Sequence, residues 1–431
     1  MSMTPKKVLL VGPVLSQSGY GEHARCVLRS LMNNIEKFDI YIQPVDWGKT
    51  STDTSDTPEN KFIIECIKRT AQYQGEFDLS LQVGLPLEWK PLAKKNIGLT
   101  AAVETDRCNP KWIEVANQIE KMVVVSDHAG RSFTNHSYPL QDQEGNSHGF
   151  LKLHKPYTVI GYPVKNYKDT GFANNLDLPE KCFLSVSQAA PRKNWENMIK
   201  WFVEEFRNED VGLLLKMNYI CDSLVDREAL KKHLRSILKN VDEDNTRKCK
   251  VLLLHGRLNE DDLHSLYTDP RMCAYITTTH GEGYGLPVFE AAYSGLPVVA
   301  PNWSGYLDFL RGPVTNEKSG KTKTKSLFSK VKYELVEVEK HALMEEIIIP
   351  GSRWASVSGD DFKKKIRSVY TSPSLPKKEA AILKEYLLTE YTEEKIYKKY
   401  MDCISTLIPE LRVEESLDDN EFAVFEIENN D

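Results

Sequence analysis

The chain has 431 residues, of which 41% are hydrophobic and 27% are charged. That length allows two or three domains with full cores, and the composition excludes a wholly disordered or fibrous protein. The 56 lysines and arginines against 62 aspartates and glutamates give a net charge of −6, so no strongly basic surface for nucleic acids or anionic membranes is predicted. The early apolar run at residues 8–15 is short and is interrupted by Gly12 and Pro13, so we expect neither a membrane span nor a signal peptide.

The eight cysteines are scattered along the chain and form no C-x-x-C pair. This pattern favours reduced thiols in a cytoplasmic protein and argues against a structural zinc site. Asp242-Glu-Asp244 has the form of a D-x-D metal motif, but it lies in a polar stretch without a strand end to aim it. We therefore expect a loop there and no metal site.

Short apolar runs alternate with longer amphipathic segments along the whole chain, which is typical of parallel sheets covered by helices. In the first half the predicted strands are residues 7–11, 40–45, 79–83, 95–99 and 121–125. In the second half they are residues 182–186, 212–216, 251–255, 274–278 and 297–300. The sequence predicts an α/β protein of two doubly wound, Rossmann-like domains that face a central cleft.

The change from the first domain (1–165) to the second (166–389) is predicted near residues 156–169. A polar segment at 141–148 indicates a surface excursion, and the lysine-rich residues 318–332 indicate a solvated loop. Residues 378–408 have helical periodicity and are long enough to cross the junction, so that 390–408 would complete the first domain. Residues 409–431 are predicted to form an acidic, poorly ordered tail, because eight of the residues 414–431 are acidic and none is basic.

The most informative segment follows the strand predicted at 274–278. It is a glycine loop that leads into a short helix, with Pro287 suited to the first position of the helix and Gly295 to its end. Gly283 and Gly285 would let backbone N–H groups approach an anion closely, and the start of the helix favours negative charge. A phosphate is the natural ligand of such a loop.

Two glutamates flank this loop. Glu290, one turn inside the helix, would repel a phosphate, so we expect it to accept hydrogen bonds from ribose hydroxyls further along the ligand. Glu282, before the loop, would face the opposite end of the ligand, where the hydroxyls of a sugar can donate to it.

With seven residues between them, Glu282 and Glu290 closely resemble the E-x7-E signature of retaining glycosyltransferases of family 4, also known as glycosyl transferases group 1, which have the GT-B fold. The resemblance implies that Gly283, Tyr284, Gly285 and Leu286 belong to the donor-binding loop.

Further segments extend the resemblance over residues 8 to about 400. Ser187 to Asn194 resembles the family's phosphate-binding segment, which places Lys193 at the lysine that holds the donor diphosphate. Ser18-Gly19-Tyr20-Gly21 resembles the N-terminal glycine loop on the other side of the diphosphate. Glu104-Thr105-Asp106 resembles the E-T-D segment of one branch of the family, and Arg353-Trp354-Ala355 resembles a late landmark.

The sequence departs from the family pattern in two places. The usual Gly-Arg pair is replaced by Ser187-Gln188, so Arg192 is a candidate to supply the missing charge. Glu104 stands where many members have a catalytic-region histidine, and we consider Glu104 and Asp106 for a role near the reacting carbon, although both are also suited to capping the next helix. His128 fits a satisfied surface histidine better than a ligand.

Lys216, at the end of a predicted strand that faces the cleft, is a candidate for an extra diphosphate contact. We therefore expect Glu282, Lys193, Glu104 and Asp106 to serve catalysis, and the two glycine loops with Arg192, Lys216 and Glu290 to bind the donor.

The resemblance implies a retaining glycosyltransferase that moves a sugar from a nucleotide sugar to an acceptor hydroxyl, with no metal and no bound cofactor. One alternative is an inactive nucleotide-sugar-binding protein of the same fold. An NAD(P)-dependent oxidoreductase is less favoured, because Gly12, Gly19 and Gly21 do not fit the G-x-G-x-x-G spacing. A GT-B phosphorylase would need a pyridoxal-phosphate lysine, for which the sequence gives no signal.

The sequence leaves the acceptor open. A glycan, a lipid-linked hydroxyl, a protein hydroxyl and a modified DNA base are all compatible with the nearly balanced charge of residues 1–165.

Overall fold

The computed structural model describes residues 4–48, 50–141, 147–315 and 319–411. Its N-terminal half contains a six-stranded parallel sheet of order β2-β1-β3-β4-β5-β8. The strands are β1 (Lys6–Gly12), β2 (Phe38–Pro44), β3 (Leu79–Val83), β4 (Lys95–Thr100), β5 (Lys121–Val124) and β8 (Tyr157–Val159). The flanking helices are α1 (Gly19–Met32), α2 (Pro58–Gln72), α3 (Pro110–Gln118) and α4 (Asp127–Thr134).

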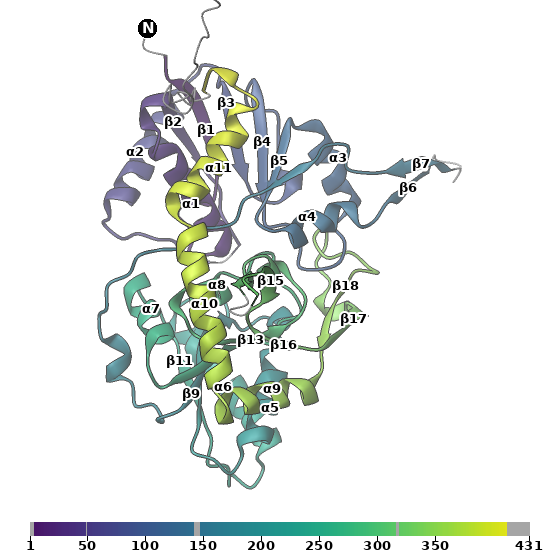
Figure 1. Cartoon of the computed structure of the whole chain (residues 1–431). Helices are drawn as coiled ribbons and strands as arrows, with labels where there is room; N and C mark the ends of the chain where they lie inside the picture. Colours follow the sequence, from purple (N-terminus) through teal and green to yellow (C-terminus); the bar gives the residue numbers. More distant parts are fainter. Residues whose placement is uncertain (1–3, 49, 142–146, 316–318, 412–431) are drawn as a thin grey trace, which may run out of the picture.

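A second six-stranded parallel sheet follows, of order β11-β10-β9-β12-β13-β16. Its strands are β9 (Cys182–Gln188), β10 (Gly212–Asn218), β11 (Lys250–Leu254), β12 (Met272–Ile276), β13 (Val298–Pro301) and β16 (Ser329–Val331). Its helices are α5 (Trp195–Phe206), α6 (Leu224–Val241), α7 (Glu260–Thr268), α8 (Leu286–Ser294) and α9 (Gly359–Thr371). Every predicted strand overlaps an observed one, and the predicted α/β class is confirmed. Figure 1 shows the two sheets one above the other.

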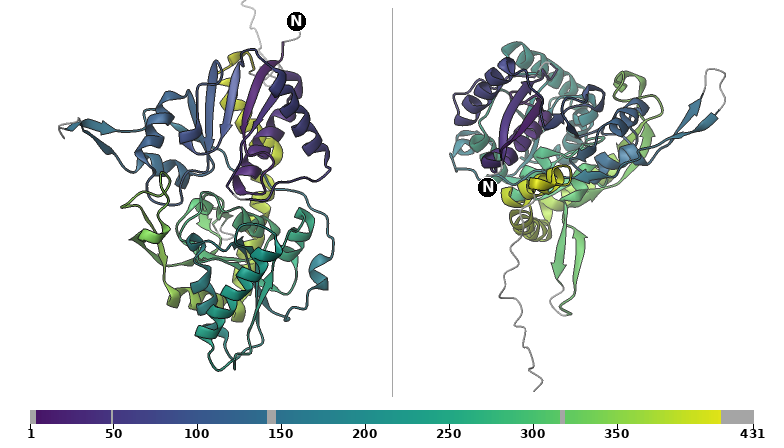
Figure 2. Two further views of the ribbon diagram at one scale, coloured as in Figure 1. Left: turned by 180° about the vertical axis from the view of Figure 1, so that it is seen from behind. Right: turned by 90° about the horizontal axis from the view of Figure 1, so that it is seen from above.

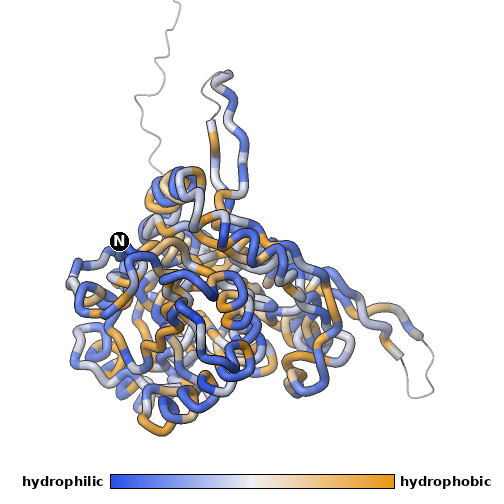
Figure 3. The backbone as a smooth tube through the Cα atoms, turned by 90° about the horizontal axis from the view of Figure 1, so that it is seen from below, coloured by the Kyte–Doolittle hydropathy of each residue, from blue (hydrophilic) through white to orange (hydrophobic). Residues whose placement is uncertain are grey.

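Three antiparallel hairpins lie outside the two sheets. They pair β6 (Tyr138–Gln141) with β7 (Ser147–Leu151), β14 (Arg311–Thr315) with β15 (Thr322–Ser326), and β17 (Tyr333–Glu337) with β18 (Arg353–Val357). Figure 2 (right) and Figure 3 show the first two projecting from the body of the molecule. Short 3-10 turns complete the structure: η1 (Ile35–Lys37), η2 (Pro86–Glu88), η3 (Phe172–Asn175), η4 (Pro191–Lys193), η5 (Gly305–Asp308), η6 (Lys340–Ala342) and η7 (Pro409–Leu411).

The prediction of a solvated loop at residues 318–332 was wrong, because β15 and β16 lie within it. In β15 lysine and threonine alternate, and from Thr322 to Lys325 every residue is exposed. Since neither face of β15 is buried, its sequence lacks the alternation of apolar and polar residues that predicts a strand. The pairing with β14 holds the segment extended. The polar segment predicted at 141–148 as a surface excursion includes the start of β7, and residues 142–146 lie outside the described ones.

The predicted helical segment 378–408 is two helices, α10 (Ser374–Glu390) and α11 (Glu393–Ser405). The break lies at Tyr391 and Thr392, where the Thr392 side chain accepts a hydrogen bond from the backbone of Lys395. α10 packs against α8 and β14, whereas α11 packs against α1 (Figure 1). At the crossing, Val164 N donates to Tyr391 O over 2.7 Å. The predicted acidic tail begins at residue 409. Its first three residues form η7, and the others lie outside the described residues. None of the described helices has the length and apolar run needed to cross a membrane.

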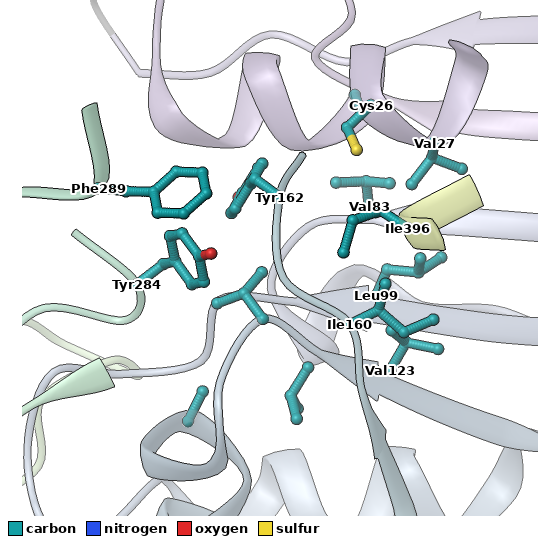
Figure 4. Packing of buried hydrophobic residues seen from close by; sticks show 14 of the residues in the cluster. Cys26, Val27, Val83, Leu99, Val123, Ile160, Tyr162, Tyr284, Phe289 and Ile396 are labelled. Carbon is teal, nitrogen blue, oxygen red and sulfur yellow. The ribbon is translucent and has the colours of Figure 1, made fainter. Parts of the chain in front are cut away.

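Apolar packing links the two sheets, because one hydrophobic cluster contains residues of both, while a second cluster lies within the C-terminal half. Figure 4 shows Tyr162, from the segment after β8, between α1 and the rings of Tyr284 and Phe289. The ring centroids of Tyr162 and Tyr284 are 4.8 Å apart, and those of Tyr284 and Phe289 are 5.4 Å apart. All three residues are buried in the same hydrophobic cluster. The relative position of the sheets is therefore fixed by side-chain packing as well as by the connecting chain.

The glycine loop after β12 is pressed directly against the N-terminal sheet. A Cβ added at Gly283 would lie 2.5 Å from Ala101 O, and one at Gly281 would lie 2.1 Å from Glu104 O. Ser126 Oγ, at the end of β5, also donates to Gly283 O. These glycines are required by the close approach of the two halves. The sequence did not predict this packing reason for Gly283, and the approach of an anion to the loop stays a prediction.

We expect Gly283→Ala to destabilise the protein by about 1–3 kcal/mol, because the added methyl meets rigid backbone and forces the two halves apart. Thermal unfolding measures this effect. Gly19→Ala is the matched control, since a Cβ at Gly19 has nothing within 4 Å. Equal melting temperatures for the two variants would contradict the packing role of Gly283.

Candidate active site

The carboxyl ends of β9 and β12 lie side by side and carry most of the predicted donor site. The turn η4 after β9 contains Arg192 and Lys193, and the loop after β12 contains Glu282. α8 begins at Leu286, with Gly285 at φ +92° just before it, so Pro287 is its second residue and not its first. Gly295, at φ +84°, ends the helix as predicted.

Four charged side chains form a continuous cluster between the two halves of the molecule. Glu282 is buried, and its carboxylate accepts hydrogen bonds from Lys193 Nζ at 2.6 Å and from Arg192 Nη1 at 3.1 Å. Arg192 Nη2 lies 3.0 Å from Glu104 Oε1, which belongs to the loop after β4. The structure thus brings together three of the four residues predicted to serve catalysis, and adds Arg192 as the link between them.

The cluster keeps its charges in spite of burial. Burial alone would raise the pKa of Glu282, but Lys193 and Arg192 lower it to about 2, so this carboxylate is ionised at neutral pH. Burial and the adjacent Arg192 lower the pKa of Lys193. A cationic pair is therefore held beside a carboxylate in a poorly solvated place, where electrostatic interactions are strong.

His280 and β18 hold this cluster in position, which the sequence did not predict. The backbone N of His280 donates to Arg192 O at 2.8 Å, and Nδ1 of its ring lies 2.7 Å from Ala355 O. Its ring stacks on Trp354 with centroids 4.4 Å apart. Arg353-Trp354-Ala355 thus supports the segment that carries Glu282. Nothing local in the sequence signals this pairing, because the partners are far apart along the chain.

Ser304 is a second support that the sequence did not predict. Its Oγ lies within hydrogen-bond distance of both Glu282 N and Glu282 O, and Gly305 N donates to the same carbonyl at 3.0 Å. Ser304 has φ +145°, a conformation that residues with side chains rarely adopt. The backbone of Glu282 is therefore clamped by the loop after β13.

Asp106 does not join the cluster. Its Oδ1 accepts a hydrogen bond from Arg353 N at 2.7 Å, and its Oδ2 lies 3.2 Å from Arg353 Nε and 3.3 Å from His136 Nε2. Arg107 contributes a further ion pair at 3.4 Å. The geometry gives this buried carboxylate a structural task, the attachment of β18 to the N-terminal half, and it does not support the role near the reacting carbon predicted for Asp106.

The N-terminal glycine loop begins α1, and Ser18 caps the helix by accepting a hydrogen bond from Gly21 N at 3.0 Å. A Cβ at Gly21 would lie 1.9 Å from Ser16 O, so the turn itself requires glycine there, whereas Gly19 faces open space. Tyr20 is fixed by two hydrogen bonds of its hydroxyl, with Thr100 Oγ1 at 2.9 Å and Ala101 N at 3.2 Å.

The Tyr20 ring also stacks on Trp47 with centroids 4.0 Å apart. The open side of this loop is at Gly19.

Glu290 lies apart from the cluster, on the side of α8 that faces α7. Tyr267 donates its hydroxyl to Glu290 Oε2 at 2.8 Å, and burial raises the pKa of Glu290 to about 7. A small cavity of about 20 Å³ adjoins the carboxylate and is bounded by Tyr167, whose ring stacks on His264 at 4.4 Å. Lys216, at the end of β10, donates to Gly256 O at 2.7 Å, and burial lowers its pKa.

Asp242 is the residue that ends α6, and it is buried between Arg207, at 2.7 Å, and Arg247, at 3.4 Å. The D-x-D segment lies in a loop, as predicted. Among the residues that the structure describes, no group of three or more histidine, cysteine, aspartate or glutamate side chains is placed to hold a metal ion.

Residues 167–316 match the model of the family described as Glycosyl transferases group 1. Three similar solved structures cover almost the whole chain. The Anabaena protein HepE in complex with UDP and glucose has a TM-score of 0.58 at 11% identity, over 93% of this chain and 100% of its own. Sucrose-phosphate synthase from Thermosynechococcus elongatus has a TM-score of 0.61 at 12% identity, over 94% and 100%.

A glycosyltransferase from Rickettsia africae has a TM-score of 0.58 at 14% identity, over 94% and 99%. No curated protein matches the sequence. At these identities the likeness shows the fold: the chain is a two-sheet α/β protein of the GT-B fold, and its residues 167–316 match Glycosyl transferases group 1.

Proposed function

We propose that the protein is a retaining, metal-independent glycosyltransferase that moves a sugar from a nucleotide-sugar donor to an acceptor hydroxyl. The observation that carries the proposal is the cluster of buried Glu282 with half-buried Lys193, Arg192 and Glu104 at the meeting point of the two sheets. The match of residues 167–316 to Glycosyl transferases group 1 supports the reaction class, and the structurally similar HepE forms a complex with UDP and glucose.

In this proposal the donor lies across the carboxyl ends of β9 and β12. Lys193, Arg192 and the start of α8 hold the diphosphate, Glu282 accepts hydrogen bonds from the transferring sugar, and Glu290 accepts them from the ribose. Glu282 lies in the loop before α8 and Glu290 lies on the face of α8 toward α7, and this separation suits contacts at the two ends of one extended ligand.

We propose a chemical step with retention of configuration, as the resemblance to the family implies. The acceptor oxygen forms a bond to the anomeric carbon from the face that the diphosphate leaves, while the bond from the anomeric carbon to the diphosphate oxygen breaks. The hydroxyl proton passes to the departing phosphate oxygen, so no protein nucleophile is needed. Lys193 and Arg192 stabilise the negative charge that develops on the leaving group.

The competing function is an inactive nucleotide-sugar-binding protein on the same fold. Lys193 and Glu282, held at 2.6 Å in a buried place, favour catalysis, because a binding protein does not need a preorganised charge pair at the reacting end of the donor. A panel of sugar nucleotides, scored for release of nucleoside diphosphate with and without acceptors, separates the two. Binding without release for every donor would refute the transferase.

We expect Lys193→Ala to lower kcat more than it raises the donor KM, since the interaction strengthens as charge develops on the diphosphate. The loss should be about 3 kcal/mol, or roughly a hundredfold in rate. Arg192→Ala should act in the same direction, because Arg192 shares Glu282 with Lys193. Lys200→Ala, an exposed lysine on α5, is the matched control. A near-normal kcat for Lys193→Ala at saturating donor would place the diphosphate elsewhere.

Turnover should persist in EDTA, because Lys193, Arg192 and the start of α8 supply the positive charge that a metal supplies elsewhere. Asp242 is already paired with two arginines and is a poor candidate ligand. The measurement is the rate before and after chelation. A loss of rate that Mn²⁺ or Mg²⁺ restores would refute metal independence.

The affinity for UDP should fall roughly tenfold from pH 8 to pH 6, because a carboxyl with a pKa of about 7 becomes protonated over that interval and loses acceptor strength toward the ribose. Calorimetric titration with UDP at both pH values measures this. In Glu290→Gln the phosphate of UDP still titrates but residue 290 does not, so the affinity of this variant for UDP should change less between pH 8 and pH 6. An equal change in affinity for both proteins would contradict the ribose contact.

A further inference from the structure

A cavity of about 390 Å³ lies beside the charged cluster and is not used by the donor site described above. It is lined from the N-terminal half by α4 and the loop after β4, and from the C-terminal half by η5 with its preceding loop and by β18. In Figure 1, α4 and β18 lie at the same side of the molecule. The cavity lies at the carboxyl ends of β5 and β13. These strands are the neighbours of β4 and β12, whose following loops carry Glu104 and Glu282, so the cavity adjoins the charged cluster along the same edges of the two sheets.

The wall of this cavity is built from residues that hold the reacting groups. Ser304 lines it and binds the backbone of Glu282. Thr105 lines it and directly follows Glu104. A Cβ at Gly281 would lie 3.0 Å from the Trp303 ring, which also lines the cavity. A molecule seated here would thus lie next to the carboxylate cluster.

The lining is polar and balanced in charge. Three aspartates and three arginines line it: Asp106, Asp127, Asp308, Arg131, Arg311 and Arg353. Most of these charges are already engaged, since Arg131 pairs with Asp127 at 2.6 Å and Arg353 with Asp106 at 3.2 Å, while Asp308 Oδ2 accepts a hydrogen bond from Asp127 N at 2.7 Å. An anionic ligand would meet three carboxylates, and a lipid chain would find no continuous apolar wall.

Two side chains of the lining point to the class of ligand. Trp303 contributes an aromatic surface, and His128 packs edge-on against it with ring centroids 4.6 Å apart. Nε2 of His128 is buried without a hydrogen-bond partner among the described residues, so the expectation of a satisfied surface histidine was wrong. An aromatic face beside groups that donate and accept hydrogen bonds suits a neutral molecule with many hydroxyls, and the volume lies in the range of about 300–1,000 Å³ typical of small-molecule sites.

We propose that this cavity binds a neutral saccharide, whose ring stacks on Trp303 and whose hydroxyls bond to His128 Nε2 and to the polar lining, and that this saccharide is the acceptor. The identity of the saccharide as the acceptor rests on the proposed transferase function, whereas its binding does not.

The test uses the full chain with saturating UDP and a panel of neutral probes: methyl glycosides of glucose, galactose, mannose and N-acetylglucosamine, with maltose, cellobiose and lactose. Saturation-transfer NMR detects binding. We expect at least one probe to bind the wild type, Trp303→Ala to weaken it about tenfold, and Trp303→Phe to restore most of the loss because the aromatic face returns. Phe150→Ala, an exposed aromatic on β7 outside the cavity, is the matched control and should bind as the wild type does.

Arg131→Ala is a second test variant, for use if Trp303→Ala does not fold. Its side chain is 64% exposed at the rim of the cavity, and its loss should also weaken the probe. The proposal is overturned if no saccharide binds, if binding is equal in the wild type and both variants, or if anionic vesicles or a DNA oligonucleotide bind through these residues instead. A protein that binds a saccharide at Trp303 but releases no nucleoside diphosphate from any donor would refute the transferase and leave the saccharide site standing.

Discussion

The shared ion pairs of Arg192 are the interaction on which the rest of the site depends. One guanidinium contacts Glu104 from the N-terminal sheet and Glu282 from the C-terminal sheet, and Lys193 completes the neutralisation of Glu282. Buried charges are tolerable only when they are paired, so the four groups fix one another. The two halves must therefore meet at the loops that follow β4, β9 and β12.

Packing around the cluster makes this arrangement rigid. The loop with Gly281 and Gly283 lies against backbone of the other half, and Ser304 and the stacked His280 hold the two ends of Glu282's segment. Asp106 adds a further attachment by binding Arg353. Because these supports come from the ends of β4, β12 and β13, no single helix or loop positions the cluster, and substitutions far from the charges would still displace them.

The sequence predicts the strands of the two sheets, but it does not predict the residues that hold the charged cluster in place, and the reason is physical. Central parallel strands are buried on both faces, so they appear as apolar runs, and the loops that follow them carry the predicted residues Lys193, Glu104 and Glu282. Strand β15 is exposed on both faces and leaves no such run. His280 and Ser304 act through partners at Ala355 and Glu282 that only the tertiary structure brings close, and the attachment made by Asp106 was not predicted because its partner Arg353 is equally distant.

Glu282 and Glu290 illustrate how environment separates two residues that one motif presents as equivalent. Both are glutamates, and burial raises the pKa of each. Two cations beside Glu282 more than offset that effect and bring its pKa to about 2, whereas the main hydrogen-bond partner of Glu290 is the neutral Tyr267 hydroxyl, and its pKa stays at about 7. The first is thus a fixed charge, while the second titrates near neutral pH. In the proposed donor site, a fixed charge would suit the reacting end of the donor, where the electrostatic field must not vary, and a titrating one would make ligand affinity at the other end depend on pH.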